Sequence, residues 1–141
     1  MTRIIAGEAR GRTIKVPAEG TRPTADRARE GLFSSLNARW GFAGSSVLDL
    51  FAGSGALGLE AASRGADEAV LVESSADAIK VIRHNMGVVK HPGVRVHEMK
   101  VDTYLASAPR KHFDLVLADP PYAFDEVEEL LAAIEPVLTD H

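Results

Sequence analysis

The sequence predicts an α/β protein of the Rossmann-like type, with a mostly parallel sheet and helices on both of its faces. Short apolar segments typical of buried strands alternate with segments of helical periodicity. A glycine-rich turn follows the first of these strands, at Gly53, Gly55 and Gly58. With 141 residues, of which 45% are hydrophobic, the chain can bury one core, so we expect a single globular body.

The first forty residues predict a hairpin and a helix. Residues 3–16 alternate loosely around two glycines, which is typical of a short β-hairpin that ends at Pro17. Thr24 is a candidate N-cap for a helix that runs to about residue 39. Its apolar residues at helical spacing are Ala28, Leu32, Phe33 and Leu36.

The remaining chain alternates strands and helices, which favours parallel pairing. Predicted strands cover 47–51, 68–73, 95–99 and 113–118, and predicted helices cover 56–64, 76–88 and 124–138. In the last helix we expect Val127, Leu130, Leu131 and Ile134 to face inward. The chain stops after this helix, where an open parallel sheet would receive another strand, so we expect C-terminal strands to be missing.

Composition narrows the class of protein. The chain has no cysteine, and its five histidines show no pair at metal-ligand spacing, so we expect no metal. No apolar run approaches the roughly 18 residues of a membrane span, and the N-terminus does not resemble a signal sequence. We therefore expect a soluble, cytoplasmic protein.

Charge is distributed unevenly along the chain. Residues 1–40 carry eight basic and four acidic side chains, whereas the other 101 residues carry eight basic and sixteen acidic ones. A basic arm on an acidic body fits either a polyanion-binding surface or a merely solvated arm. The basic residues that could contact a polyanion, such as RNA, are Arg3, Arg10, Arg12, Lys15, Arg22, Arg27 and Arg29.

The glycine turn is the strongest local signal of a cofactor. Glycines let the backbone approach a ligand at the mouth of the sheet, as in NAD, FAD and methyl-donor folds alike. Asp49, four residues before Gly53, places a carboxylate that would repel a pyrophosphate and attract the cationic groups of S-adenosylmethionine, so we favour the methyl donor. The alternative is a tight turn without a ligand. The candidate cofactor residues here are Asp49, Phe51, Gly53, Ser54 and Gly55.

Two further acidic residues follow predicted strands. Glu73 lies 20 residues after Gly53, which is the separation at which an acidic side chain binds ribose hydroxyls in adenosine cofactors. Asp102 follows the third strand and is either an acceptor for the adenine amine or an exposed loop aspartate. His84 and Asn85, on the helix after Glu73, favour polar surface or capping roles over catalysis.

The candidate catalytic segment is Asp119, Pro120, Pro121 and Tyr122, directly after a buried strand. Two prolines stiffen the turn and hold the Asp119 carboxylate and the Pro120 carbonyl as a pair of acceptors. An exocyclic amine can donate both hydrogens to them while Tyr122 stacks on the base. The alternative is a plain proline turn.

The segments VLDLFAGSGALGLEA, VLVE and LVLADPPY, preceded by TRPTADRAREGLFSSL, together resemble the RsmD family of bacterial small-subunit ribosomal RNA guanine-N2 methyltransferases. The resemblance implies a class I S-adenosylmethionine-dependent methyltransferase fold and a short N-terminal extension that engages ribosomal RNA or the small subunit. We place the basic hairpin extension at 1–20 and the methyltransferase domain at 21–141, and we expect a monomer. Its product carries a methyl group on the N2 amine of a guanine in 16S ribosomal RNA. The rival functions are amino-methylation of DNA adenine or protein glutamine, and a non-catalytic RNA- or nucleotide-binding module.

Overall fold

The computed structural model describes residues 2–16, 26–39, 41–120 and 125–140. Its centre is a parallel sheet of order β5-β4-β3-β6. The four strands are β3 (Ser46–Leu50), β4 (Glu68–Glu73), β5 (Val94–Glu98) and β6 (Leu115–Ala118). The predicted parallel α/β fold is therefore confirmed, and the strand bounds differ from the predicted ones by at most two residues.

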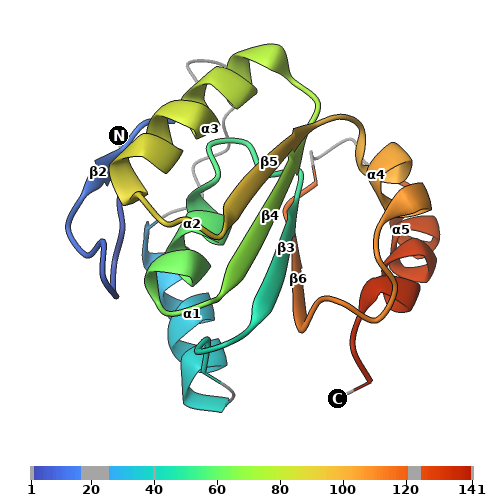
Figure 1. Cartoon of the computed structure of the whole chain (residues 1–141), viewed down its shortest axis with the longest axis horizontal. Helices are drawn as coiled ribbons and strands as arrows, with labels where there is room; N and C mark the ends of the chain where they lie inside the picture. The colour runs from blue at the N-terminus through green and yellow to red at the C-terminus, as the bar shows by residue number, and fades with distance from the viewer. Residues whose placement is uncertain (1, 17–25, 40, 121–124, 141) are drawn as a thin grey trace.

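Helices cover both faces of this sheet (Figure 1). One face carries α1 (Asp26–Arg39), α2 (Ala56–Ser63) and α3 (Ala76–Val89), and the other carries α4 (Val101–Ser107) and α5 (Val127–Ile134). The alternation of side chains along each strand gives both faces a core. For example, Leu71 packs under α2 and α3, whereas its neighbours Val70 and Val72 pack under α4.

The predicted N-terminal hairpin is present, with β1 (Thr2–Arg3) and β2 (Thr13–Ile14) paired antiparallel. Its apolar residues Ile4, Ala9 and Ile14 are buried in the same cluster as the residues beneath α2 and α3. The hairpin is thus packed against the sheet-covering helices (Figure 1) and shares their core.

The structure corrects the sequence expectations for the C-terminal helix and for residues 101–107. The expected helix at 124–138 is the shorter α5 followed by a 3₁₀ helix (Glu135–Val137), and Val127 and Leu131 are 49% and 61% exposed. Leu32 of α1 is also exposed, whereas Phe33 is fully buried against Phe42. The sequence interpretation also missed α4, although Val101, Tyr104 and Leu105 have helical spacing and are buried. Thr24, the expected N-cap, lies outside the described residues.

Candidate active site at the carboxyl edge of the sheet

A glycine loop (residues 51–55) crosses the edge of the sheet where β3, β4 and β6 end. Its path is fixed by backbone hydrogen bonds, including one from Ala52 N to Val72 O of the neighbouring strand at 3.0 Å. Phe51, Gly53 and Gly55 have φ angles of 56°, 59° and 81°. Gly55 is also the N-cap residue of α2, so the left-handed turn leads directly into a helix N-terminus.

Glu73, at the end of β4, contacts this loop. Its Oε1 accepts a hydrogen bond from Gly53 N at 2.8 Å, and its Oε2 accepts from Ser74 N and Ser75 N at 3.1 and 2.9 Å. Oε2 thus uses both of its lone pairs, whereas Oε1 has a second lone pair that can still accept a hydrogen bond from a ligand hydroxyl. The strand-end acid and the glycine loop, 20 residues apart in sequence, are therefore brought together by the fold.

Asp49 is buried beneath the same loop, with 1% of its surface exposed. Its Oδ2 accepts from Gly58 N at 2.9 Å, while its buried Oδ1 has no hydrogen-bond partner among the described residues. Burial raises the pKa of Asp49 to about 8; the Gly58 bond lowers it, and the charges of Asp119 and Glu73 raise it further. Burial therefore favours the neutral form of Asp49, whereas we expected a charged carboxylate from the sequence.

The candidate catalytic segment is described in part. Asp119 and Pro120 follow β6 and are half-buried, and Asp119 lies near enough to Asp49 for its charge to raise the pKa of that group. Pro121 and Tyr122 lie outside the described residues. The carboxyl ends of three adjacent strands thus each carry an acidic residue: Asp49 is the penultimate residue of β3, Glu73 ends β4 and Asp119 follows β6. Together they form one acidic edge.

Asp102 does not lie in a loop, as one interpretation of the sequence had it. It is in the first turn of α4, after the carboxyl end of β5, and is exposed. Its Oδ1 accepts from Thr103 N at 2.8 Å, a local bond at the helix start. Among the described residues, no group of three or more His, Cys, Asp or Glu side chains is placed to hold a metal ion.

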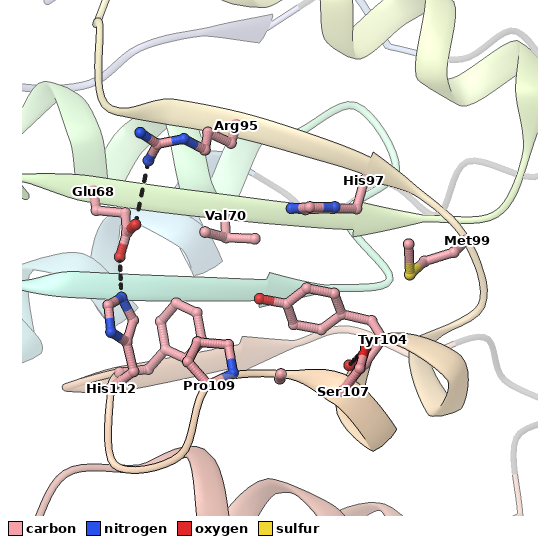
Figure 2. Close-up of a pocket in the computed structure, with 11 residues that line it drawn as sticks. Glu68, Val70, Arg95, His97, Met99, Tyr104, Ser107, Pro109 and His112 are labelled. Carbon is pink, nitrogen blue, oxygen red and sulfur yellow. Dashed lines mark hydrogen bonds and ion pairs between the residues drawn. The ribbon is translucent and has the colours of Figure 1, made fainter.

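A hollow of about 470 Å³ lies on the α4 face of β4 and β5. Figure 2 shows Glu68 between two basic groups, with Oε2 3.3 Å from Arg95 Nη1 and Oε1 2.6 Å from His112 Nε2. The hollow contains none of the residues that the sequence singled out. Glu68, Arg95 and His112 in this hollow already bind one another. We therefore place the candidate active site at the carboxyl edge of the sheet instead.

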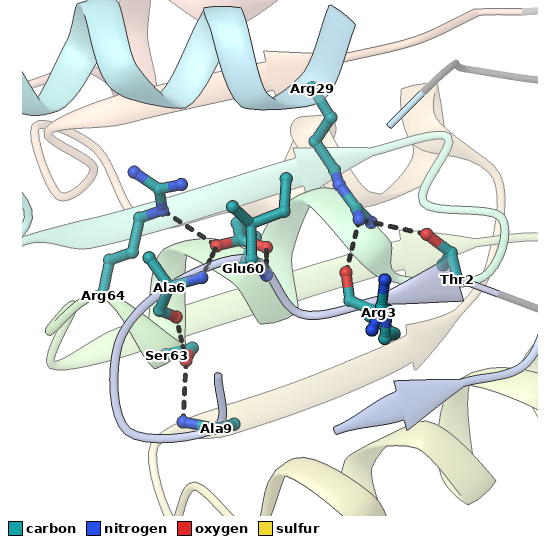
Figure 3. Close-up of polar contacts among 9 residues, drawn as sticks. Thr2, Arg3, Ala6, Ala9, Arg29, Glu60, Ser63 and Arg64 are labelled. Atoms are coloured by element: carbon teal, nitrogen blue, oxygen red, sulfur yellow. Dashed lines mark hydrogen bonds and ion pairs between the residues drawn. The ribbon is translucent and has the colours of Figure 1, made fainter. Parts of the chain in front are cut away.

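Buried polar groups of α2 fasten the hairpin (Figure 3). The carboxylate of Glu60, which is fully buried, accepts from the backbone N–H groups of residues 5–6 at 2.8 and 3.0 Å and from Arg64 Nε at 2.9 Å. Ser63 Oγ accepts from Ala9 N at 2.9 Å and donates to Ala6 O at 2.6 Å. The hairpin is therefore held in one position relative to the helix that begins at the glycine loop.

The predicted RNA-contacting residues fall into distinct groups. Arg29 is only 4% exposed and donates through Nη2 to Thr2 Oγ1 and to the carbonyl of Arg3, so a phosphate would not reach it in this arrangement. Arg12 is exposed but donates to the carbonyls of Val88 and Val89, at the end of α3, at 3.1 Å each.

Of the other candidates, three are exposed and two have side chains that the structure does not describe. The residues Arg3, Arg10 and Lys15 are exposed. Arg22 lies outside the described residues, and Arg27 lies in α1 with its side chain outside the description. The exposed cations of the hairpin are therefore the ones available to a polyanion, while Arg29 and Arg12 help to hold the hairpin on the body.

Sequence reasoning missed Asn85, which we expected at the surface of α3 and which is fully buried. The signal was present, because position 85 continues the buried stripe of Ala78, Ile79, Ile82 and Val89. A polar residue on such a stripe needs buried partners. Here its partners are the hairpin and the glycine loop.

The strand order, the glycine turn after β3 and the acidic residue at the end of β4 define a Rossmann-like domain of the kind found in class I methyltransferases and in dinucleotide-binding proteins. A family model described as Conserved hypothetical protein 95 matches residues 2–140. The chain belongs to this family, which is the RsmD family that the sequence resembles.

Three known proteins illustrate the relationship. Ribosomal RNA small subunit methyltransferase D of Escherichia coli K12 is 40% identical over 134 residues, which cover 94% of this chain and 66% of that protein. The protein of the same name from Haemophilus influenzae is 35% identical over 136 residues, covering 94% and 69%. The solved structure of a hypothetical protein from Thermus thermophilus has a TM-score of 0.84 and 41% identity, covering 94% and 78%. The chain thus spans about two thirds of the length of the two curated relatives.

Proposed function

We propose that this chain uses S-adenosylmethionine to methylate the exocyclic N2 amine of a guanine in small-subunit (16S) ribosomal RNA. The observation that carries the proposal is the acidic edge of Asp49, Glu73 and Asp119 beside the glycine loop, in a chain whose relatives are named small-subunit ribosomal RNA methyltransferases. The carboxylates of Glu73 and Asp119 suit a cationic cofactor better than a dinucleotide pyrophosphate.

The residues present fit this cofactor. Glu73 Oε1 has one lone pair left for a ribose hydroxyl. The buried Oδ1 of Asp49, without a partner among the described residues, is an acceptor or donor for a ligand at the loop. At Gly58 an added Cβ would lie 2.5 Å from Leu71 Cδ2 and 3.1 Å from Asp49 Oδ2, so glycine there allows α2 to approach β3 and β4. When bound, the cofactor supplies a methyl group activated by its sulfonium.

In our proposal the protein's own task is to hold the amine. The Asp119 carboxylate and the Pro120 carbonyl accept the two amine hydrogens, which orients the nitrogen. The amine becomes acidic once alkylated, so Asp119 or water can take the released proton and no strong general base is required. Tyr122 supplies a stacking face for the extruded base. The exposed cations of the hairpin bind RNA phosphates.

The experiment that tests this function is incubation of the chain with unmethylated small-subunit ribosomal RNA and labelled S-adenosylmethionine. The RNA is then digested to nucleosides for mass spectrometry. We expect labelled N2-methylguanosine. Label on adenosine would replace the guanine assignment, and binding of both ligands without any label would favour the non-catalytic module.

A further inference from the structure

Asn85 joins the basic hairpin to the glycine loop through one side chain. Its Nδ2 donates to Ser54 O, between the two loop glycines, and to Lys15 O, at 2.9 Å each. Its Oδ1 accepts from Lys15 N at 2.8 Å. Both amide hydrogens and the amide oxygen are therefore used, and the side chain is fully buried.

Asn85 connects a residue proposed to lie at the cofactor site with a residue proposed to bind RNA. Ser54 is in the loop where the cofactor would bind, and Lys15 is one of the exposed cations that would bind RNA. A buried amide whose every hydrogen bond is satisfied loses heavily if either end moves away, because the freed group stays buried without a partner. A displacement of Ser54 or of Lys15 therefore breaks a buried hydrogen bond of Asn85 and costs free energy.

We infer that Asn85 is a positioning residue that couples cofactor binding at the glycine loop to RNA binding at the hairpin. This inference rests on the proposed function. Ordering of Ser54 by the cofactor fixes Asn85, which fixes Lys15 in the position that RNA requires. By linkage, RNA raises the affinity for the cofactor by the same factor as the cofactor raises the affinity for RNA.

Ser63 provides the matched control. It is also a buried polar residue of a helix, and its hydroxyl makes two hydrogen bonds to the hairpin, but neither of these bonds reaches the glycine loop. Ser63→Ala and Asn85→Ala should both lower the melting temperature. Only Asn85→Ala should uncouple the two ligands.

The first test is calorimetric titration of S-adenosylhomocysteine into the wild-type chain, with and without a saturating small-subunit ribosomal RNA transcript. We expect the RNA to tighten binding about fivefold or more, the lower end of typical coupling. The factor should fall to about one in Asn85→Ala and persist in Ser63→Ala. An unchanged factor in Asn85→Ala, or a factor of one in wild type, would overturn the inference.

A second test needs no variant and so does not depend on folding of a mutant. Hydrogen exchange of the Lys15 amide, which is bonded to Asn85 Oδ1, is measured with and without S-adenosylhomocysteine and without RNA. The cofactor should slow this exchange several-fold and leave the Ala9 amide, bonded to Ser63 Oγ, unchanged. Equal exchange at Lys15 in both conditions contradicts the inference. Failure of either ligand to bind at all instead contradicts the proposed function.

Discussion

The Asp49 Oδ2 atom accepts a hydrogen bond from the backbone nitrogen of Gly58 at 2.9 Å, and a Cβ at position 58 would lie 3.1 Å from the same oxygen. This contact joins the end of β3 to the first turns of α2 and buries an acid whose pKa is raised to about 8. A buried acid of this kind makes both the stability of the protein and the protonation state of the candidate site depend on pH.

Asp49→Asn should therefore change how stability varies with pH. The pKa of Asp49 is about 8 in the folded chain against 3.8 unfolded, so between these values the folded state holds the extra proton. The contribution of Asp49 to the free energy of unfolding is therefore largest below pH 3.8. It falls by up to about 1.4 kcal/mol per pH unit as the pH rises from 3.8 to about 8. The amide of an asparagine at position 49 cannot titrate, so its contribution stays constant.

Urea denaturation of both proteins across a pH series measures the difference. Asp49→Asn should gain stability relative to wild type from about pH 5 to about pH 8, with other titrating groups cancelling in the comparison. Parallel curves for the two proteins would show that Asp49 has an ordinary pKa in the folded chain.

S-adenosylhomocysteine should stabilise the chain and NAD should not. A ligand at a hundred times its Kd adds about 2.7 kcal/mol to the free energy of unfolding, or roughly 5 to 10 °C in Tm for a domain of this size. Glu73→Gln should reduce the shift, because Glu73 contacts Gly53 of the loop. Thermal denaturation with each ligand measures the effect, and a shift with NAD alone would exclude the methyl-donor assignment.

Asp119→Ala should separate catalysis from binding. It removes one of the two proposed amine acceptors but leaves Glu73, the glycine loop and the hairpin intact, so both ligands should still bind. Methyl transfer should fall about a hundredfold or more, since one positioned polar contact in a transition state is worth about 3 kcal/mol. The matched control is Asp140→Ala, an exposed carboxylate paired with Lys111. Wild-type transfer by Asp119→Ala at saturating cofactor would contradict the amine clamp.

The arginines of the N-terminal segment should differ in their effects. Arg10→Ala should weaken RNA binding and reduce the salt dependence of the binding constant by about one per lost phosphate contact, with little effect on Tm. Arg29→Ala should instead lower Tm, because Arg29 is buried and holds Thr2 and the Arg3 carbonyl. Filter binding over a salt series and thermal denaturation distinguish the two effects. RNA affinity unaltered in Arg10→Ala at every salt concentration favours a solvated arm.

Residue patterns along the chain were enough to specify the order and type of most elements, because period-two and period-3.6 patterns report which face each segment buries. The same patterns located the glycine turn and Glu73, because the 20 residues between Gly53 and Glu73 are those of one strand–helix–strand unit. They did not reveal α4, which is too short for its pattern to stand out, and they overestimated the inward face of α5.

Only the tertiary structure, in contrast, decided which polar side chains are buried and which distant residues they bind. Glu60, Asn85 and Arg29 look like ordinary surface side chains in the sequence, yet each is buried and has a partner at least 26 residues away along the chain. The raised pKa of Asp49 likewise depends on burial and on charges that follow two other strands. Periodicity reports only local burial, whereas these partners meet because the sheet and its helices bring distant segments together.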